Sequence, residues 1–394
     1  MVMTSPSPPW TSHSWQSKPV AQAIEYANKH ELDDVCTQLS TLPNLTTAHE
    51  VDTLNALLEQ AALGNAFIIQ GGDCAEAFSD VNPQTVALKQ GLLATQARFL
   101  ESQLECPVIS IGRIAGQYSK PRSKCHERLA CGSVVDAFRG DNVNAVAKTQ
   151  RAPDPERLLM GYFYSAATML MLRMGQTASS ELGKRFFTSH EALHLPLETS
   201  LTKGDLNTSA HMLWIGERSR AIDGAHVEYV RGLRNPVGVK LGPTADPEGL
   251  VELLDLLDPE RRPGRVTLIT RFGANEVASS LPALIRAVQR SGHQPVWLCD
   301  PMHGSTFTTS SGIKTRSIQT ILEEMVAVHM VHLDCGSRLC GLHLEQTGEE
   351  VTECVEVDER GEMFENYRSL CDPRLSGSQA TRLVKSYVAC IQSA

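Results

Sequence analysis

Short runs of β-branched and other apolar residues alternate along this chain with longer segments that have helical spacing. A polar or glycine-containing turn follows most of the short runs. This alternation is typical of βα units arranged around a parallel sheet. The predicted strands cover residues 66–70, 107–112, 185–189, 211–216, 237–241, 265–270, 294–299 and 340–344. The predicted helices cover residues 83–103, 155–174, 219–233, 247–257, 274–292, 315–331 and 379–392.

Eight strands in this alternation predict an α/β fold, the (β/α)8 or TIM barrel. A doubly wound open sheet is the alternative, but such sheets usually carry a G-x-G-x-x-G loop after the first strand, and this chain has none. The 394 residues contain no internal repeat and no linker rich in Pro, Gly or Ser. We therefore expect an N-terminal arm and helical extension over residues 1–60 and one barrel domain over residues 61–394.

Composition excludes several classes of function. Lys and Arg total 36 against 45 for Asp and Glu, so the net charge of −9 disfavours binding to nucleic acid or anionic lipid. The longest apolar stretch, residues 158–172, is too short to span a membrane. The N-terminus lacks the basic start and apolar block of a signal peptide, and the eleven cysteines form no C-x-x-C pair. We expect a cytoplasmic protein with reduced thiols.

Reactive side chains follow nearly every predicted strand. In a barrel these positions share one rim, the face where active sites lie. Loops are polar in any case, because their backbone must be solvated, but the excess of cations at these positions stands out in an acidic chain. The cations are Arg113, Lys120, Arg122, Arg218, Lys240 and Arg271. Their convergence indicates an anionic ligand, since guanidinium groups suit carboxylate and phosphate.

One loop and one strand carry a more specific expectation. Lys120, Arg122 and Ser123 form a stiff loop around Pro121 that could cradle a phosphate, although an ordinary surface loop has the same composition. Lys240 lies inside an otherwise apolar strand. A buried lysine is costly unless it is paired, so Lys240 is expected to be functional.

Four residues could bind a metal ion. Cys74 and His303 lie in turns, Glu345 follows the last predicted strand, and Asp372 lies near the C-terminus. One thiolate, one imidazole and two carboxylates suit Mn, Co, Fe or Zn, and do not match the closed ligand sets of structural zinc sites. No short spacing links the four, and His343 competes with Glu345 as a ligand or is a core histidine.

Ten motifs together resemble those of the type II (plant-like) 3-deoxy-D-arabino-heptulosonate 7-phosphate (DAHP) synthases. They are QGGDCAE (70–76), GRIAGQYSKPRS (112–123), FRGDN (138–142), HEAL (190–193), WIGER (214–218), DGAHVE (223–228), NPVGVK (235–240), DPMHG (300–304), TGEEVTEC (347–354) and CDPRL (371–375). The resemblance runs from about Trp15 to the C-terminus in the family's order. It implies a (β/α)8 barrel that condenses phosphoenolpyruvate with erythrose 4-phosphate, the first step of the shikimate route to chorismate and the aromatic amino acids.

The resemblance also implies roles for individual residues. It makes Cys74, His303, Glu345 and Asp372 the ligands of a divalent metal, and so selects Glu345 over His343. Arg113, Lys120, Glu217, Arg218, Lys240 and Arg271 surround phosphoenolpyruvate, and Lys120, Arg122 and Ser123 also reach the aldose phosphate. Lys240 and Glu217 are the catalytic candidates for holding the attacking water and handling its proton. A homo-oligomer is expected.

This chain resembles a short form of the family. It lacks an insertion between the helix ending near Met174 and the strand starting near Arg185, which carries feedback sites in long members. Short members are typically associated with secondary metabolism, so we expect weak or no inhibition by aromatic amino acids. Two rival functions stay open at this point. One is an amino-DAHP synthase that uses an imino form of erythrose 4-phosphate, and the other is a catalytically idle scaffold.

Overall fold

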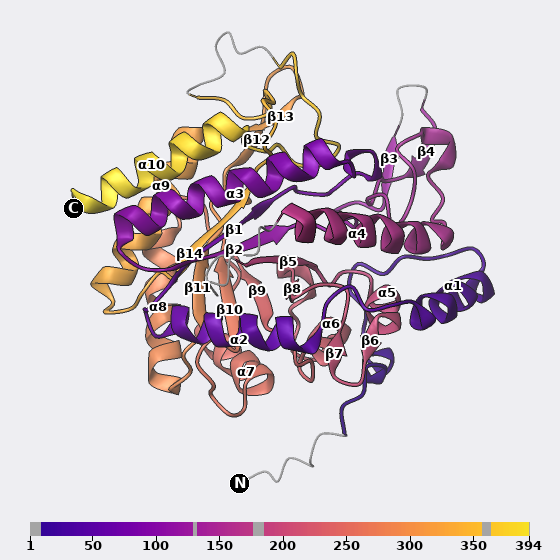
Figure 1. Cartoon of the computed structure of the whole chain (residues 1–394), viewed down its shortest axis with the longest axis horizontal. Helices are drawn as coiled ribbons and strands as arrows, with labels where there is room; N and C mark the ends of the chain where they lie inside the picture. The colour runs from indigo at the N-terminus through magenta and orange to yellow at the C-terminus, as the bar shows by residue number, and fades with distance from the viewer. Residues whose placement is uncertain (1–8, 129–131, 176–184, 357–363, 394) are drawn as a thin grey trace.

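Eight parallel strands form a closed barrel at the centre of the molecule (Figure 1). The structure is a computed structural model and describes residues 9–128, 132–175, 185–356 and 364–393. The strands, in their order around the barrel, are β1 (Phe67–Gly72), β2 (Val108–Arg113), β5 (Phe186–Glu191), β8 (Met212–Ile215), β9 (Val237–Leu241), β10 (Val266–Thr270), β11 (Val296–Cys299) and β14 (Gly341–Glu345). Because β14 pairs with β1, the predicted barrel is confirmed and the open sheet is excluded.

All eight predicted strands are present, and the β9 prediction matches the observed bounds. Every residue of β1, β2, β9, β10, β11 and β14 is buried. Parallel strands that are covered on both faces have continuous apolar sequences, and the strands were predicted from these apolar runs. The largest errors are two residues: β11 starts two residues after the predicted 294, and β1 and β5 end two residues after the predicted 70 and 189.

Helices surround the barrel and follow most of its strands (Figure 1). They include α3 (Pro83–Leu104), α4 (Glu156–Gly175), α5 (Leu195–Ser200), α6 (Ala225–Val230), α7 (Pro247–Leu257), α8 (Val277–Ser291), α9 (Ile318–Asp334) and α10 (Gly377–Gln392). Local sequence sets several of their starts. Asn82 caps α3, where Pro83 occupies the first turn, and Ser376 forms a capping box with Gln379 at α10.

Two helix predictions were wrong in extent. In place of the helix predicted over 219–233, the chain forms the 3-10 turn η5 (Glu217–Ser219) and the short helix α6. A turn at Gly224 separates these two elements. The helix predicted to begin at 315 begins at 318. Residues Lys314–Arg316 instead form strand β13, which pairs with β12 (Thr306–Thr308). The hairpins β3–β4 (His126–Arg128 and Val134–Asp136) and β6–β7 (Thr202–Lys203 and Leu206–Asn207) were not predicted.

The N-terminal extension is helical and contacts the barrel. It contains η1 (Ser14–Ser17), α1 (Lys29–Thr41) and α2 (Ala48–Ala62). Leu54 and Leu58 of α2 are fully buried and pack with Ile68 and Leu298, so α2 covers part of the barrel core. The domain division at residue 60 stays a prediction, and it falls within the last turn of α2. Within the described part of the chain, no helix has both the length and the apolar character needed to cross a membrane.

Candidate active site at the carboxyl end of the barrel

The carboxyl ends of the strands enclose a cavity of about 910 Å³. Every site residue predicted from the sequence lines this cavity except Glu345, which is fully buried. The strands place these side chains directly, because Arg113 ends β2 and Glu345 ends β14. The predicted lining residues are Cys74, Arg113, Lys120, Arg122, Ser123, Glu217, Arg218, Lys240, Arg271, His303 and Asp372. Residues far apart in sequence therefore meet at one rim, as the barrel prediction required.

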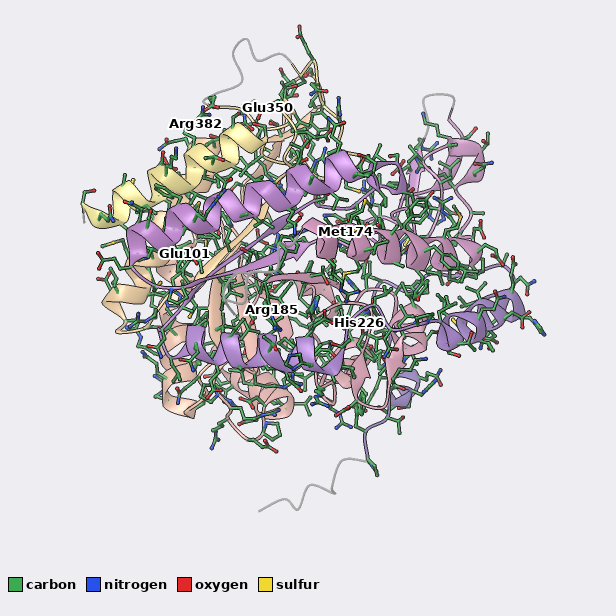
Figure 2. The ribbon with its side chains drawn as sticks, viewed as in Figure 1. Glu101, Met174, Arg185, His226, Glu350 and Arg382 are labelled. Carbon is green, nitrogen blue, oxygen red and sulfur yellow. The ribbon has the colours of Figure 1, made fainter. Side chains whose placement is uncertain are left out.

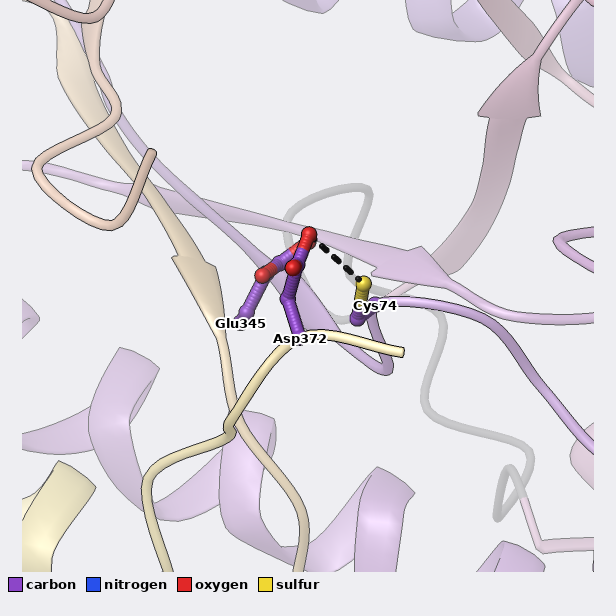
Figure 3. Close-up of side chains that lie close together, drawn as sticks. All are labelled: Cys74, Glu345 and Asp372. Carbon is purple, nitrogen blue, oxygen red and sulfur yellow. Dashed lines mark hydrogen bonds between the residues drawn. The ribbon is translucent and has the colours of Figure 1, made fainter. Parts of the chain in front are cut away.

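Three of the four metal-ligand candidates form one cluster. The ligand atoms of Cys74, Glu345 and Asp372 all lie within 4.8 Å of one another (Figure 3). The Cys74 thiol donates a hydrogen bond to Asp372 Oδ2 over 3.5 Å. In Figure 3 the three side chains converge from the loop after β1, the end of β14 and the C-terminal segment. The geometry brings together residues separated by almost 300 positions.

His303 joins this cluster through Glu345. Its Nε2 atom lies 3.1 Å from Glu345 Oε1, and its Nδ1 atom lies 2.7 Å from Asp300 Oδ2. A carboxylate on the second ring nitrogen is a common way to orient a histidine ligand. The four side chains thus offer sulfur, nitrogen and oxygen donors at one place, and this donor set fits a borderline divalent metal.

Electrostatics keep the two carboxylates of the cluster ionised and the thiol protonated. Burial opposes the charged form of Glu345, yet His303 and Arg316 hold its pKa well below the ordinary value. Lys120 likewise lowers the pKa of Asp372 against the effect of burial. Burial, reinforced by Glu345, raises the pKa of the Cys74 thiol well above its ordinary value. A metal bound at Cys74 would therefore displace a proton from sulfur.

His343 has a different environment from Glu345. Its Nδ1 atom lies 2.7 Å from Gln70 Oε1, and its Nε2 atom lies 2.7 Å from Lys240 Nζ. Burial, together with Lys240 and Arg113, lowers the pKa of His343 well below the ordinary value. Both ring nitrogens have neighbours, and His343 is not part of the three-residue cluster. The geometry favours a neutral His343 that contacts Gln70 and Lys240 through its two ring nitrogens.

Cations surround the cluster and extend along the cavity. Lys120 Nζ lies 2.6 Å from Cys74 Sγ and 2.7 Å from Asp372 Oδ2. Arg113 donates to Glu345 Oε1 over 2.9 Å, and Arg271 donates to the carbonyl of His303 over 3.0 Å. Further out, Arg218 donates to the Ser123 hydroxyl over 2.9 Å. The cavity is therefore lined by positive charge from the metal-ligand candidates to the Lys120–Ser123 loop.

Lys240 and two glutamates are the proton-transfer candidates. Burial lowers the pKa of Lys240 to about 8, although its ion pair with Asp300 opposes the shift. Glu217 accepts hydrogen bonds from Gly242 N (2.6 Å), Thr244 (2.6 Å) and Arg220 (3.0 Å). Glu191 lines the same cavity, and its carboxylate accepts no hydrogen bond from any described residue. Burial raises the pKa of Glu191, and Lys120 opposes this rise.

Sequence reasoning missed a buried ionic network behind the cavity. Asp73 Oδ1 accepts from Arg374 over 2.6 Å, and Asp73 Oδ2 pairs with Lys89 of α3. Arg374 also donates to Glu353 over 2.8 Å. Asp73 and Arg374 flank Cys74 and Asp372 in sequence, so their ion pair joins the two loops that carry these ligand candidates. A charge within two residues of each proposed ligand was the only sequence signal for this pair.

Two more carboxylates shape the loops of the site. Glu353 accepts from the backbone N–H groups of Arg368, Ser369 and Arg374. Glu76 accepts from the consecutive N–H groups of residues 115, 116 and 117. Each carboxylate satisfies three backbone donors that would otherwise need water. The expected lack of an insertion before Arg185 concerns residues 176–184, which lie outside the described residues.

Comparison with known proteins identifies relatives along nearly the whole chain. The model of the class-II DAHP synthetase family matches residues 10–182 and 175–388. A Neurospora crassa protein named phospho-2-dehydro-3-deoxyheptonate aldolase is 39% identical, and the alignment covers 96% of this chain and 94% of that protein. A Streptomyces coelicolor protein of the same name is 38% identical, with coverage of 97% and 98%.

One solved structure has the same fold. The phospho-2-dehydro-3-deoxyheptonate aldolase of Francisella tularensis SCHU S4 superposes with a TM-score of 0.55 at 12% sequence identity. The superposition covers 95% of this chain and 97% of that chain. At this identity the similarity supports the barrel fold alone.

Proposed function

Because this chain belongs to the class-II DAHP synthetase family, we propose that it condenses phosphoenolpyruvate with erythrose 4-phosphate and water. The products are DAHP and inorganic phosphate, and the reaction is the first step of the shikimate route. One observation carries this proposal. A thiol, an imidazole and two carboxylates meet several cations at one cavity, which suits two phosphorylated substrates and a metal ion.

The cations divide between the two substrates. Arg113, Arg218 and Arg271 offer guanidinium groups for the carboxylate and phosphate of phosphoenolpyruvate. Lys120, Arg122 and Ser123 are proposed to reach the phosphate of erythrose 4-phosphate. Cys74, His303, Glu345 and Asp372 would hold the divalent metal, Mn or Co in first place and Fe or Zn in second. When bound there, the metal would polarise the aldehyde of the aldose.

The chemistry joins two carbons and then releases phosphate. The enol carbon of phosphoenolpyruvate forms a bond to the aldehyde carbon, and positive charge develops on the second carbon of phosphoenolpyruvate. Water adds to that carbon and gives up one proton, while the former aldehyde oxygen takes one up. The bond between that carbon and the phosphate oxygen then breaks, so the new hydroxyl becomes the ketone oxygen and its proton leaves with phosphate. Lys240, with a pKa of about 8, can exchange a proton near neutral pH. We assign Glu191 to the water beside Lys240 and give Glu217 an orienting role, because the Glu217 carboxylate already accepts three hydrogen bonds.

A single assay tests the reaction and its metal dependence. Phosphate release and DAHP formation are measured with both substrates before chelation, after chelation, and after Mn or Co is restored. We expect activity, its loss and its recovery in that order, and we expect Cys74→Ser and His303→Ala to lose metal and turnover. Full turnover by the chelated protein would refute the metal assignment.

The same assay separates the rival functions. Replacing erythrose 4-phosphate with its imino form would support turnover in an amino-DAHP synthase, since the metal and phosphoenolpyruvate residues would be unchanged. Metal-loaded protein that releases no phosphate with either aldose would identify an idle scaffold. The paired cations and the assembled ligand cluster favour a working enzyme over a scaffold.

We also propose that the protein is a homo-oligomer. Met160, Phe163, Leu170 and Met174 of α4 are exposed, and Figure 2 marks Met174 near the end of this helix. Their spacing places four large apolar side chains along one stripe of α4, a pattern found at helix–helix interfaces. Light scattering should give a mass above the 43.1 kDa of one chain. Phe163→Glu should lower that mass, and a monomeric wild-type protein would refute the proposal.

A further inference from the structure

The N-terminal arm reaches the cavity at Gln22. Before this point the arm is fixed to the barrel by two tryptophans. The Trp10 indole donates to the carbonyl of Glu228 over 3.0 Å, and the Trp15 indole donates to Thr199 over 2.7 Å. Ala225 N donates to the carbonyl of Pro19 over 2.9 Å. These contacts determine where the chain arrives, and Gln22 then lines the cavity beside Arg122 and Ser123.

Gln22 holds the backbone of the proposed aldose-phosphate loop. Its side-chain oxygen accepts a hydrogen bond from Arg122 N over 2.8 Å. Lys120 N donates to the carbonyl of Arg139 over 2.8 Å, and Pro121 has no N–H group. The two backbone donors of residues 120–122 are therefore both paired. One of these acceptors lies 100 positions away, in the N-terminal arm.

Arg139 closes this arrangement from the other side. Its guanidinium donates to the carbonyl of Gln22 over 2.8 Å and to the carbonyl of Ala23 over 2.9 Å. The carbonyl of Arg139 thus accepts a hydrogen bond from Lys120, and the Arg139 side chain donates to the arm. The Gln22 side chain in turn accepts from Arg122. Three segments distant in sequence constrain one another around the phosphate loop.

The backbone of Gln22 adds an independent observation. Its φ of 59° lies in the left-handed region, where glycine is the easier residue. Within the described ranges only three other non-glycine residues share a positive φ. A non-glycine residue in such a conformation at a functional cavity suggests that its side chain is used. At Gln22 the side chain is used to accept the hydrogen bond from Arg122 N.

The amide orientation follows from its partner. A backbone N–H group requires an acceptor, so the oxygen of the Gln22 amide faces Arg122. The amide nitrogen has no hydrogen-bond partner among the described residues, and it remains available at the cavity wall.

We propose that Gln22 is a positioning residue of the aldose-phosphate site, and that the N-terminal arm is therefore part of the active site. This inference rests on the proposed function, which assigns that site to Lys120, Arg122 and Ser123. The arm holds the loop in the conformation that binds phosphate, so loss of the Gln22 contact weakens binding of the aldose and spares phosphoenolpyruvate. The effect should appear in the KM for one substrate.

The experiment compares Gln22→Met, Gln22→Gly and the control Gln16→Gly in the full-length, metal-loaded protein. Met removes the hydrogen bond at similar length, and Gly also relieves the left-handed conformation. Gln16 is exposed in the same arm, and its side chain makes no hydrogen bond to a described residue. Both Gln22 variants should raise the KM for erythrose 4-phosphate about three- to tenfold, as expected for one lost hydrogen bond. The KM for phosphoenolpyruvate, the metal content and the Gln16→Gly kinetics should stay within about twofold.

Two measurements keep the inference falsifiable. Thermal unfolding of Gln22→Gly should show an unchanged or higher midpoint, because glycine tolerates a positive φ, so a KM effect cannot be ascribed to unfolding. Calorimetry with inorganic phosphate, after saturation with phosphoenolpyruvate, reads the aldose-phosphate site without turnover. Binding that is weaker in both variants supports the proposal.

Unchanged erythrose 4-phosphate kinetics and phosphate binding in both variants would overturn the positioning role. Equal losses for both substrates would also overturn it, because they would show a general structural effect. A wild-type protein that binds phosphate but makes no DAHP would instead refute the proposed function, and the calorimetric comparison would still test Gln22.

Discussion

Arg113 and Arg218 both present a guanidinium group to the cavity, but they differ in what else they hold. Arg218 is exposed and donates to the Ser123 hydroxyl. Arg113 is buried and donates to Glu345 and to the carbonyls of Asp73 and Cys74. Removing Arg113 therefore leaves several buried acceptors without a partner, whereas removing Arg218 does not.

Substitution of the cavity cations should separate binding from stability. Arg218→Ala and Arg271→Ala should weaken phosphoenolpyruvate binding by about 1.5–3 kcal/mol each, or roughly ten- to a hundredfold. Their unfolding midpoints should change little. Arg113→Ala should lose both affinity and stability. Calorimetry beside substrate titration measures both quantities, and a large loss of stability in Arg218→Ala would show that it is a structural ion-pair partner.

Glu191 and Glu217 differ at the same scale. Glu191→Gln should lower kcat about a hundredfold or more, because it removes a proton acceptor beside Lys240. Glu217→Gln should mainly raise the KM for phosphoenolpyruvate, because the Glu217 carboxylate orders the backbone at Gly242. Steady-state kinetics at saturating metal distinguish the two. A larger loss of kcat in Glu217→Gln would return the proton role to the residue chosen from the sequence.

At the scale of elements, the ion pair of Asp73 with Arg374 joins the loop after β1 to the C-terminal segment. Lys89 pairs with the same aspartate but comes from α3, and it makes no hydrogen bond or ion pair with the described residues of the Asp372 segment. Arg374→Gln and Lys89→Gln therefore each remove one positive charge from Asp73, and Arg374→Gln also removes one from Glu353. Only Arg374→Gln separates the two loops that carry Cys74 and Asp372.

We expect Arg374→Gln to weaken Mn binding about ten- to a hundredfold, the range for residues that orient metal ligands. Lys89→Gln should destabilise the metal-free protein and change Mn affinity by less than about threefold. Titration calorimetry of the chelated proteins gives the affinities, and thermal unfolding gives the stabilities. Equal effects on Mn affinity would mean that burial of Asp73, and not the joining of the loops, organises the site.

The stability of the whole molecule should depend on pH through Glu324. This residue of α9 is fully buried and accepts from Phe272 N (3.0 Å) and Gly273 N (2.9 Å), which follow β10. Burial raises its pKa from 4.5 to about 7. Between these values Glu324 stays protonated in the folded state and ionises in the unfolded state, so the contribution of Glu324 to stability falls as pH rises through this window.

Compared with low pH, the loss of stability due to Glu324 should reach about 3 kcal/mol at the upper end of the window. The stability of Glu324→Gln relative to the wild type should rise between pH 4.5 and about 7, because the amide does not ionise. Glu323→Gln is the matched control, since Glu323 is the exposed neighbour on the same helix. Chemical unfolding across this pH range measures the effect. A wild-type stability that rises with pH in step with Glu324→Gln would contradict the assignment.

The order of strands and helices was readable from the sequence because barrel strands are buried on both faces. Runs such as residues 237–241 therefore stay apolar along their length. The helix predicted over 219–233 failed because local spacing does not show that a turn at Gly224 divides the segment. The N-terminal helices were expected only as an unspecified extension. Their contact with the barrel core depends on residues far along the chain.

The sequence by itself determined the fold class and the residue types of the site, since strand ends in a barrel share one rim. It also supplied the motifs from which the family resemblance named Cys74, His303, Glu345 and Asp372. Only the tertiary structure decided which carboxylate carries spare hydrogen-bonding capacity, that Arg374 joins two loops, and that Gln22 reaches the loop of residues 120–123. The last two depend on hydrogen bonds between segments 100 or more positions apart, and sequence spacing holds no information on such contacts.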